Sequence, residues 1–328
     1  MYFALGICLT LACLLVVNLA VAIAASAVWR LISAGLPEMS AATRAKIIFG
    51  LRVLPVLTAF VIAGGLVVPS YVLYEPDASG EVVGSKLAIA AFISCIAVLF
   101  ALVRLSRTFL STRRLVTNWL ANGKRIRSHE QGVPVYVIEH QFPVIALVGI
   151  LRPRIFVAAM VLDSLNENEI DAALAHEYGH LAASDNLKRA LLRICRDLLI
   201  VPIGGGLDRE WSQITEKAAD ERAARSGRAS ALDLAGALVK IARIAPFHAH
   251  PAMPSGAFLI ERDEIDVTSR VKSLLTISPG LAAVPERNSY LTWLWAGVLV
   301  AILLLPLVNQ GIYGFTHDAI ERVVRLLQ

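Results

Sequence analysis

Four long apolar stretches dominate the pattern of hydrophobic and polar positions along the chain. Asp, Glu, Lys and Arg are all absent from positions 1–29, 53–74, 87–103 and 288–316. A helix of about 20 apolar residues crosses a hydrocarbon core roughly 30 Å thick. We therefore expect four membrane-spanning helices, at 1–29, 48–74, 87–106 and 288–316. The first run lacks the charged region of a signal peptide, so we expect it to be retained.

Residues 107–287, between the third and fourth predicted spans, are long enough for a domain with its own core. Short runs rich in β-branched residues predict a small sheet, with strands at 133–139, 142–148 and 154–159. The period then becomes helical, and Ser164-Leu-Asn-Glu167 has the pattern of a capping box, which predicts a helix over 166–183. The fold class is mainly α: a multi-span α-helical membrane protein with a small α+β domain and a short tail at 317–328.

Two further segments mix charged and apolar residues. Residues 107–123 can form a basic amphipathic helix that runs along the membrane surface. Residues 187–203 are apolar enough to suggest a fifth span, but they include five charged side chains. Because charges inside a membrane are costly, we expect an interfacial or domain-packing helix there.

The composition agrees with a membrane protein. Of the 328 residues, 56% are hydrophobic and 17% are charged. A soluble protein has roughly 45–50% apolar and 25% charged residues, so a purely water-soluble globule is excluded.

The distribution of charge predicts the orientation in the membrane. The net charge is +5, and seven basic residues but no acidic one lie between Arg104 and Arg127. The loop at 74–86 instead has three acidic residues and one lysine. Because Lys and Arg favour the cytoplasmic side, we expect a cell (inner) membrane protein with its N-terminus and tail outside and its domain in the cytoplasm. We expect the basic segment to contact anionic lipid and not nucleic acid.

The predicted helix at 166–183 contains the sequence His176-Glu177-Tyr-Gly-His180. Two histidines at i and i+4 project from one helix face, as two imidazole ligands of a tetrahedral Zn²⁺ must. Glu177 is placed beside the first ligand, where a carboxylate can act as general base toward a metal-bound water. This short pattern also arises by chance, so a zinc site needs a third ligand.

A third ligand is offered 36 residues after His180, where Glu216-Lys-Ala-Ala-Asp220 opens a helical stretch over 216–225. Glu216 and Asp220 share one helix face, so Glu216 can reach the metal while Asp220 orients a ligand. A solvated helix face would also produce these charges. Two histidines and one glutamate with an open position are typical of catalytic zinc, and we expect one Zn²⁺ per chain.

The combination of His176-Glu-x-x-His180, Asp185 and Glu216-x-x-x-Asp220 resembles the integral-membrane zinc peptidases typified by the β-lactam sensor-transducers, which cleave cytoplasmic repressors. It is similar, more loosely, to the CAAX prenyl endopeptidases and the bacterial heat-shock membrane proteases. The layout of three spans, a zinc domain and a fourth span also resembles the sensor-transducers. Their large extracellular sensor domain would follow the fourth span, where only 12 residues remain here, so we do not expect drug sensing.

The resemblance implies a zincin-like metallopeptidase domain and further site residues. Asp185 and Asp220 would support the ligands, and His250 and Arg270 follow the third ligand as candidates for oxyanion stabilisation. An ordinary surface histidine is the alternative for His250. A peptide substrate can pair in extended form with an exposed sheet edge. The expected edge is Ala146, Leu147 and Val148, for which a buried core strand is the alternative.

The sequence therefore predicts a membrane-embedded zinc endopeptidase that cuts a cytoplasmic protein, such as a transcriptional repressor in a signalling pathway. A quality-control protease for membrane proteins is the alternative within the same enzyme class. A non-catalytic zinc-binding receptor or scaffold is the alternative from another class, but a scaffold has no need of a general base at Glu177. A membrane partner that regulates the enzyme is also expected.

Overall fold

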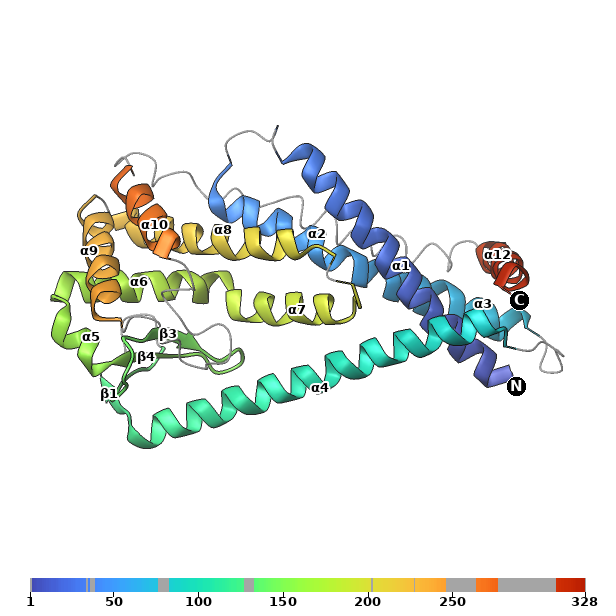
Figure 1. Cartoon of the computed structure of the whole chain (residues 1–328), viewed down its shortest axis with the longest axis horizontal. Helices are drawn as coiled ribbons and strands as arrows, with labels where there is room; N and C mark the ends of the chain where they lie inside the picture. Colours follow the sequence, from blue (N-terminus) through green and yellow to red (C-terminus); the bar gives the residue numbers. More distant parts are fainter. Residues whose placement is uncertain are drawn as a thin grey trace.

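The computed structural model describes residues 2–33, 35, 39–75, 83–126, 133–201, 203–226, 228–245, 264–276 and 311–327. The molecule is elongated, with long helices at one end and a small sheet covered by shorter helices at the other (Figure 1). One helix, α4 (Ser85–Asn122), runs between the two ends. The small sheet and the long helices therefore lie at opposite ends of α4, the longest helix among the described residues.

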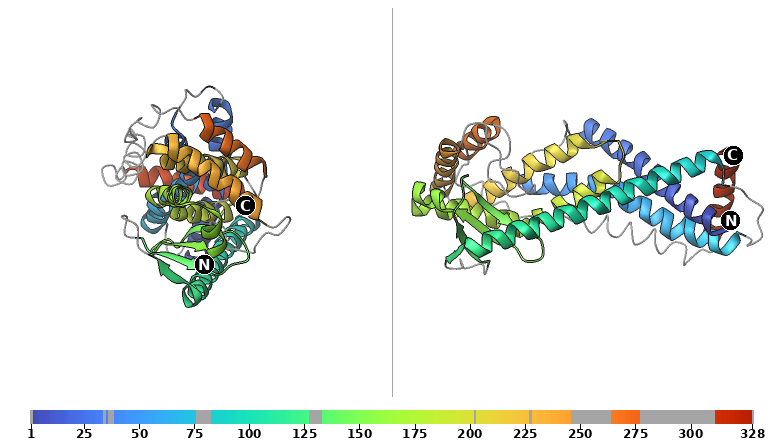
Figure 2. Two further views of the ribbon diagram at one scale, coloured as in Figure 1. Left: turned by 90° about the vertical axis from the view of Figure 1, so that its left-hand side faces the viewer. Right: turned by 60° about the horizontal axis from the view of Figure 1, so that its bottom comes forward.

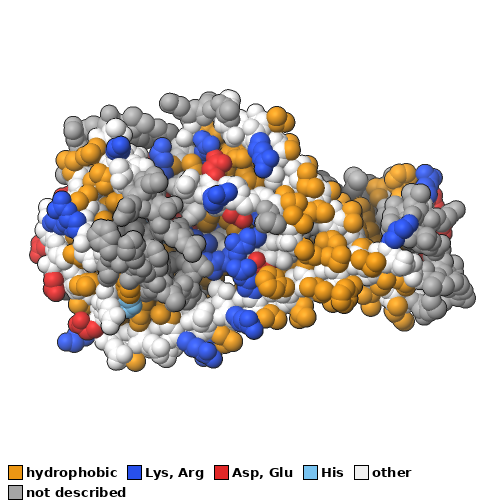
Figure 3. Space-filling view, viewed as in Figure 1, with side chains coloured by type: hydrophobic (Ala, Val, Ile, Leu, Met, Phe, Trp, Pro, Cys, Tyr) orange, Lys and Arg blue, Asp and Glu red, His pale blue; other side chains and the backbone are white. Residues whose placement is uncertain are grey.

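Three long apolar helical segments correspond to the first three predicted spans. They are α1 (Tyr2–Ile32), the stretch Ala41–Tyr74 and α4, and each is long and apolar enough to cross a membrane. The stretch Ala41–Tyr74 consists of α2 (Ala41–Ile62), a π-helical turn η1 (Ala63–Val67) and α3 (Val68–Tyr74). Hydrophobic side chains cover the narrow end of the molecule that these helices form (Figure 3).

The fourth predicted span, 288–316, lies mostly outside the described residues. Its last residues, from Gly311, begin α12 (Gly311–Leu327), which also contains most of the predicted tail. This helix packs against α3, η1 and α4. The described part of the tail is thus helical.

The expectation of a separate surface helix at 107–123 is corrected by the structure. These residues continue α4 without a break, so that span and basic segment are one helix (Figure 2). The reason is local: no glycine or proline occurs between Ser85 and Asn122, so nothing stops the helix where the charges begin.

A four-stranded sheet has the order β1-β2-β4-β3. Its strands are β1 (Lys124–Ile126), β2 (Val135–Ile138), β3 (Ile145–Val148) and β4 (Arg154–Ala158). Strands β2 and β4 are parallel, and the other pairs are antiparallel. The three predicted strands are present in shortened form, and β3 lies at an edge of the sheet. Strand β1 was not predicted, because its three residues are exposed and two of them are basic.

The remaining described helices surround the sheet and lead back to the membrane helices. They are α5 (Ala159–Ser164), α6 (Glu167–Ala183), α7 (Asp185–Asp197), α8 (Gly205–Ala223), the 3₁₀ turn η2 (Ala224–Ser226), α9 (Arg228–Ile244) and α10 (Glu264–Thr276). The core lies between the sheet, α6 and α9, where Phe156, Leu234 and Ile241 are fully buried. Helix α8 starts well before the predicted stretch at 216–225.

The capping box of α6 is made by other residues than those predicted. The Asn166 side chain accepts from the backbone N–H of Glu169, and the Glu169 carboxylate accepts from the N–H of Asn166, both at 2.9 Å. Ser164 is still in α5, where its hydroxyl donates to the carbonyl of Met160. The helix at 166–183 is confirmed, but its start is fixed two residues later along the chain than Ser164.

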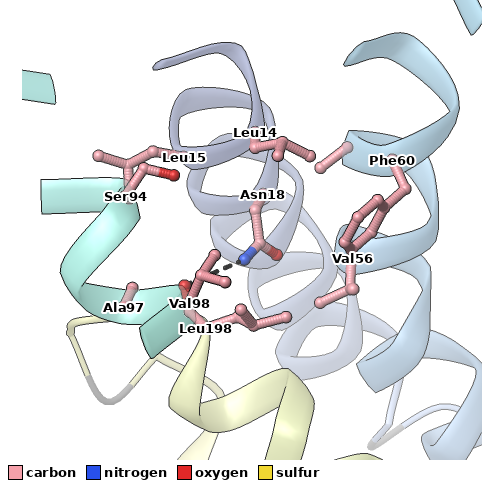
Figure 4. Close-up of a pocket in the computed structure, with 10 residues that line it drawn as sticks. Leu14, Leu15, Asn18, Val56, Phe60, Ser94, Ala97, Val98 and Leu198 are labelled. Carbon is pink, nitrogen blue, oxygen red and sulfur yellow. Dashed lines mark hydrogen bonds between the residues drawn. The ribbon is translucent and has the colours of Figure 1, made fainter. Parts of the chain in front are cut away.

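Helix α7 packs between the domain and the membrane helices, as expected of a domain-packing helix. It contacts α2, α4 and α6, and its 13 residues are too few to cross a bilayer. Beyond its end, Leu198 lines a small cavity with residues of α1, α2 and α4 (Figure 4). There the Asn18 amide donates to the carbonyl of Leu198 at 3.4 Å. The end of α7 is thereby tied to α1.

Candidate active site

Helix α6 presents His176 and His180 from one face, one turn apart. Both side chains are buried, and their Nε2 atoms are 3.1 Å apart. Two ring nitrogens at this distance point toward a common position. The spacing predicted from the sequence is therefore present in the structure.

Helix α8 brings Glu216 to the same position. One oxygen of its carboxylate is 3.4 Å from Nε2 of His176, and the other is 3.4 Å from Nε2 of His180. The close approach of α6 and α8 depends on Gly179. A Cβ atom at Gly179 would lie 3.2 Å from the Cα of Ala219 on α8, which is tighter than ordinary packing allows.

These three side chains fit a zinc ion. The ligand atoms of a tetrahedral centre with metal–ligand distances of 2.0–2.1 Å are about 3.3 Å apart, close to the 3.1 and 3.4 Å observed. Among the described residues, no group donates a hydrogen bond to the buried Oε2 of Glu216, although Nε2 of His176 and Nη1 of Arg270 lie 3.4 and 3.3 Å away. His176, His180 and Glu216 form a candidate metal cluster, and their chemistry matches a catalytic site with an open position.

Two aspartates hold the imidazoles from behind. Nδ1 of His180 is 2.8 Å from Oδ2 of Asp185, and Nδ1 of His176 is 2.8 Å from Oδ1 of Asp220. When Nδ1–H donates to a carboxylate, the Nε2 lone pair is left to face a metal. The structure thus brings both aspartates to the places that the sequence had suggested.

Arg270 of α10 is buried beside these groups. Its Nε and Nη2 donate to the two oxygens of Asp220 at 2.9 and 2.7 Å, and its Nη1 is 3.3 Å from Oε2 of Glu216. This geometry commits the guanidinium to holding two carboxylates, which favours that role over oxyanion stabilisation. The other candidate for that task, His250, lies outside the described residues.

The charges of the site are strongly coupled. Burial alone would raise the pKa of Glu216, but His180, His176 and Arg270 hold it well below its ordinary range. Burial alone would lower the pKa of His180, but Glu216 and Asp185 outweigh it and raise the pKa to about 10. In the absence of a metal the site therefore holds protons that a metal must displace.

Glu177 lies in a different environment from the ligands. Its carboxylate is buried, and burial raises its pKa, although His180 and His176 oppose the shift. The backbone N–H of Leu147 in β3 donates to Oε2 of Glu177 at 2.7 Å. A carboxylate that is buried, close to the ligands and held by one hydrogen bond is suited to accept and return a proton.

The register of β3 shows which groups point out of the sheet edge. Ala146 pairs with Phe156 of β4, and the N–H of Ala158 donates to Val144. Because backbone groups alternate along an antiparallel strand, Ala146 faces β4, and Ile145 and Leu147 face outward. Both outward-facing backbone groups of Leu147 are already hydrogen-bonded: its N–H donates to Glu177, and its carbonyl accepts from a side-chain amide.

That amide belongs to Asn186, which the sequence did not single out. Its Nδ2 donates to the carbonyls of Leu147 at 2.9 Å and Gly149 at 3.1 Å. In the sequence, the only feature that could have pointed to Asn186 is its position directly after Asp185, the aspartate that supports His180. Helix α7 thereby fixes both a ligand and the edge strand.

A comparison with known protein families agrees with this geometry. Residues 112–208 match Peptidase family M48, and no curated protein matches the chain. The matched range contains His176, Glu177 and His180 but ends before Glu216, which the fold adds to the site. Together with the three apolar helices, the match supports a zinc-dependent metalloprotease in a membrane protein.

Proposed function

We propose that this chain is a membrane-embedded zinc endopeptidase that cuts a cytoplasmic protein, such as a transcriptional repressor in a signalling pathway. The observation that carries the peptidase activity is the position of Glu177. Its buried carboxylate lies beside His176, His180 and Glu216 and is hydrogen-bonded to the sheet edge. A site that only bound zinc would not require this carboxylate.

The residues of the site have distinct tasks in this proposal. His176, His180 and Glu216 would hold one Zn²⁺, which when bound supplies a Lewis acid for the water and the scissile carbonyl. Glu177 takes the proton of the attacking water and later delivers it to the leaving amine. Asp185 and Asp220 keep the imidazoles in orientation. Burial raises the pKa of Glu177 in the metal-free site, which makes its carboxylate a stronger base for the first transfer.

The substrate is proposed to lie along β3 in an extended form. The position of β3 at the edge of the sheet and its hydrogen bond to Glu177 support this choice. Main-chain pairing would hold the scissile bond at a fixed distance from the metal with little dependence on sequence. All four residues of β3 are buried, which corrects the expectation of an exposed edge. A substrate could therefore pair with the outward-facing backbone of Ile145 only after this edge is uncovered.

The cytoplasmic location rests on the loop charges. The first basic residues after the third span, Arg104 and Arg107, would contact anionic lipid on the cytoplasmic side, and a membrane partner would regulate access to β3. A cytoplasmic domain makes cytoplasmic proteins the accessible substrates. No contact with nucleic acid is part of the proposal.

The test is comparative proteomics of cells that express the unmodified chain or Glu177→Gln. We expect one or a few proteins to be cut only by the unmodified chain. A cut repressor would support the signalling role, and cut membrane proteins would favour quality control instead. If no protein were cut while zinc remained bound, the chain would be a zinc-binding receptor or scaffold.

A further inference from the structure

The helix that carries the metal ligand Glu216 also carries Asp208, about two turns closer to its N-terminus. Asp208 accepts two hydrogen bonds from Arg52 of α2, from Nε at 2.7 Å and from Nη2 at 3.2 Å. Such paired contacts fix the relative orientation of the two groups. One end of α8 is therefore joined to a membrane helix, and the other carries the metal site.

Arg52 is placed with little freedom. It is the single Asp, Glu, Lys or Arg between Lys46 and Glu75, and only 3% of its side chain is exposed. Gly204, at φ +85°, lies against its guanidinium, where a Cβ atom would come within 3.2 Å of the arginine Cζ. A buried charge is costly unless it is paired, so the arginine and Asp208 depend on each other.

Helix α8 can transmit this constraint over its length. It runs without interruption from Gly205 to Ala223 and packs extensively against α2. A second tie lies between its two ends, where Glu210 accepts from Arg44 at 2.6 Å and from the Trp29 indole at 2.7 Å. A rigid helix that is fixed at one end moves as a unit, so a shift at Asp208 also moves Glu216.

We propose that Arg52 is a positioning residue for the metal site. Through Asp208 it sets the rotation and height of α8, and so the place of the Glu216 carboxylate relative to His176 and His180. The inference rests on the zinc site of the proposed function. It adds that a membrane helix controls the geometry of that site.

The experiment measures the zinc affinity of the full chain in detergent, by competition with a chelator, in a Glu177→Gln background that lacks the proposed general base. We expect Arg52→Gln and Asp208→Asn each to weaken zinc binding about 3- to 30-fold. The double variant should be no weaker than the single ones, because both break the same pair. Arg52→Lys, which keeps the charge but loses the paired contact, should be intermediate.

A second readout separates positioning from simple stabilisation. The visible spectrum of the Co²⁺-loaded protein should change in Arg52→Gln, because the ligand geometry changes. Arg104→Gln is the matched control, since it breaks a half-exposed ion pair to Asp197, at the opposite end of α7 from Asp185. Its zinc affinity should stay within about twofold of the parent, and its Co²⁺ spectrum should not change.

The proposal is overturned if folded Arg52→Gln and Asp208→Asn bind zinc within twofold of the parent, even with a lower thermal midpoint. Should Arg52→Gln not fold, Arg52→Lys and Asp208→Asn decide by the same criterion. A parent chain that binds no zinc would overturn the metal site and this inference together. A chain with Glu177 in place that binds zinc tightly but cuts nothing would contradict only the proposed proteolysis.

Discussion

At the scale of single residues, the orientation of each imidazole depends on the carboxylate at its Nδ1 atom, opposite the Nε2 atom that faces Glu216. Asp185 and Asp220 accept from the Nδ1 atoms of His180 and His176. Asp220 is itself held by Arg270. Removing the charge of Asp220 would therefore loosen a ligand and weaken the paired contact with the buried Arg270.

The first prediction is that Asp220→Asn lowers zinc affinity by about 10- to 100-fold, as changes behind a metal ligand do. The measurement is metal analysis and chelator competition on protein in detergent, in which the parent holds about one zinc per chain. Glu177→Gln is the control that should keep the metal and lose proteolysis. Full zinc in a His176→Ala/His180→Ala variant would contradict the assignment of the ligands.

The second prediction concerns pH. The pKa of His180 is raised to about 10 in the metal-free site, from about 6.5 in an unfolded chain. Its protonated form therefore stabilises the metal-free fold fully below about 6.5, and this contribution is lost as the pH rises through about 10. The thermal midpoint of chelator-treated protein should fall over that window.

Zinc should behave in the opposite way over the same window. Because the ligands must lose their protons, zinc affinity should rise with pH until about 10. His180→Gln should flatten the pH dependence of the metal-free thermal midpoint. An unchanged slope in that variant would assign the effect to other groups.

At the scale of helices and strands, the sequence was most informative where one pattern repeats within one element. The helix at 166–183 and the edge strand follow from local periodicity, and His176, Glu177 and His180 share a single helix. Contacts between distant elements leave no such pattern. The contacts of Arg270 and Asn186 and the pair Arg52–Asp208 join residues that are 37 to 156 positions apart.

Helix boundaries were also hard to predict, for a physical reason. The charges that begin after residue 103 mark where α4 leaves the predicted apolar zone, but they do not weaken the helix itself. Polarity and helix propensity are separate properties, and only the second ends a helix.

The third prediction tests whether a substrate pairs with β3. Ile145→Pro removes an N–H that points out of the sheet while the bonds of Ala146 to β4 stay in place. Cleavage of the natural substrate should be lost, while zinc content stays at about one per chain. Ile145→Ala is the control, since it truncates the same fully buried side chain but keeps the N–H. Both variants should have a lower thermal midpoint because of the cavity, and only the proline variant should lose cleavage.

A proline at the neighbouring position, Ala146, should reduce stability instead of only substrate docking. Ala146→Pro removes a bond within the sheet, so it should lower the thermal midpoint and not act on docking alone. If Ile145→Pro kept full activity, the substrate would dock elsewhere.

At the scale of the whole molecule, the fourth prediction is the orientation in the membrane. Single cysteines placed at Asp77 and Gln328, in a chain without its four native cysteines, should react with an impermeant reagent in intact cells. Cysteines at His129 and Asp263 should react only after the membrane is opened. Labelling at Asp263 in intact cells would make the substrate extracytoplasmic and exclude a cytoplasmic repressor.

The length of α4 sets a minimum reach for any substrate that is anchored in the same bilayer. Its 38 residues extend about 57 Å, of which the hydrocarbon core takes roughly 30 Å. If α4 crosses the membrane at 87–106, as the sequence predicts, Trp119 lies 13 residues or about 20 Å beyond the hydrocarbon core. It packs on Phe156 of the sheet with ring centroids 5.0 Å apart, so the sheet is expected at about that distance from the core. An extended tether covers about 3.3 Å per residue. Membrane-anchored reporters should therefore be cut only when about six or more residues separate the anchor from the cleaved bond, and equal cutting at two residues would show that the sheet lies against the bilayer.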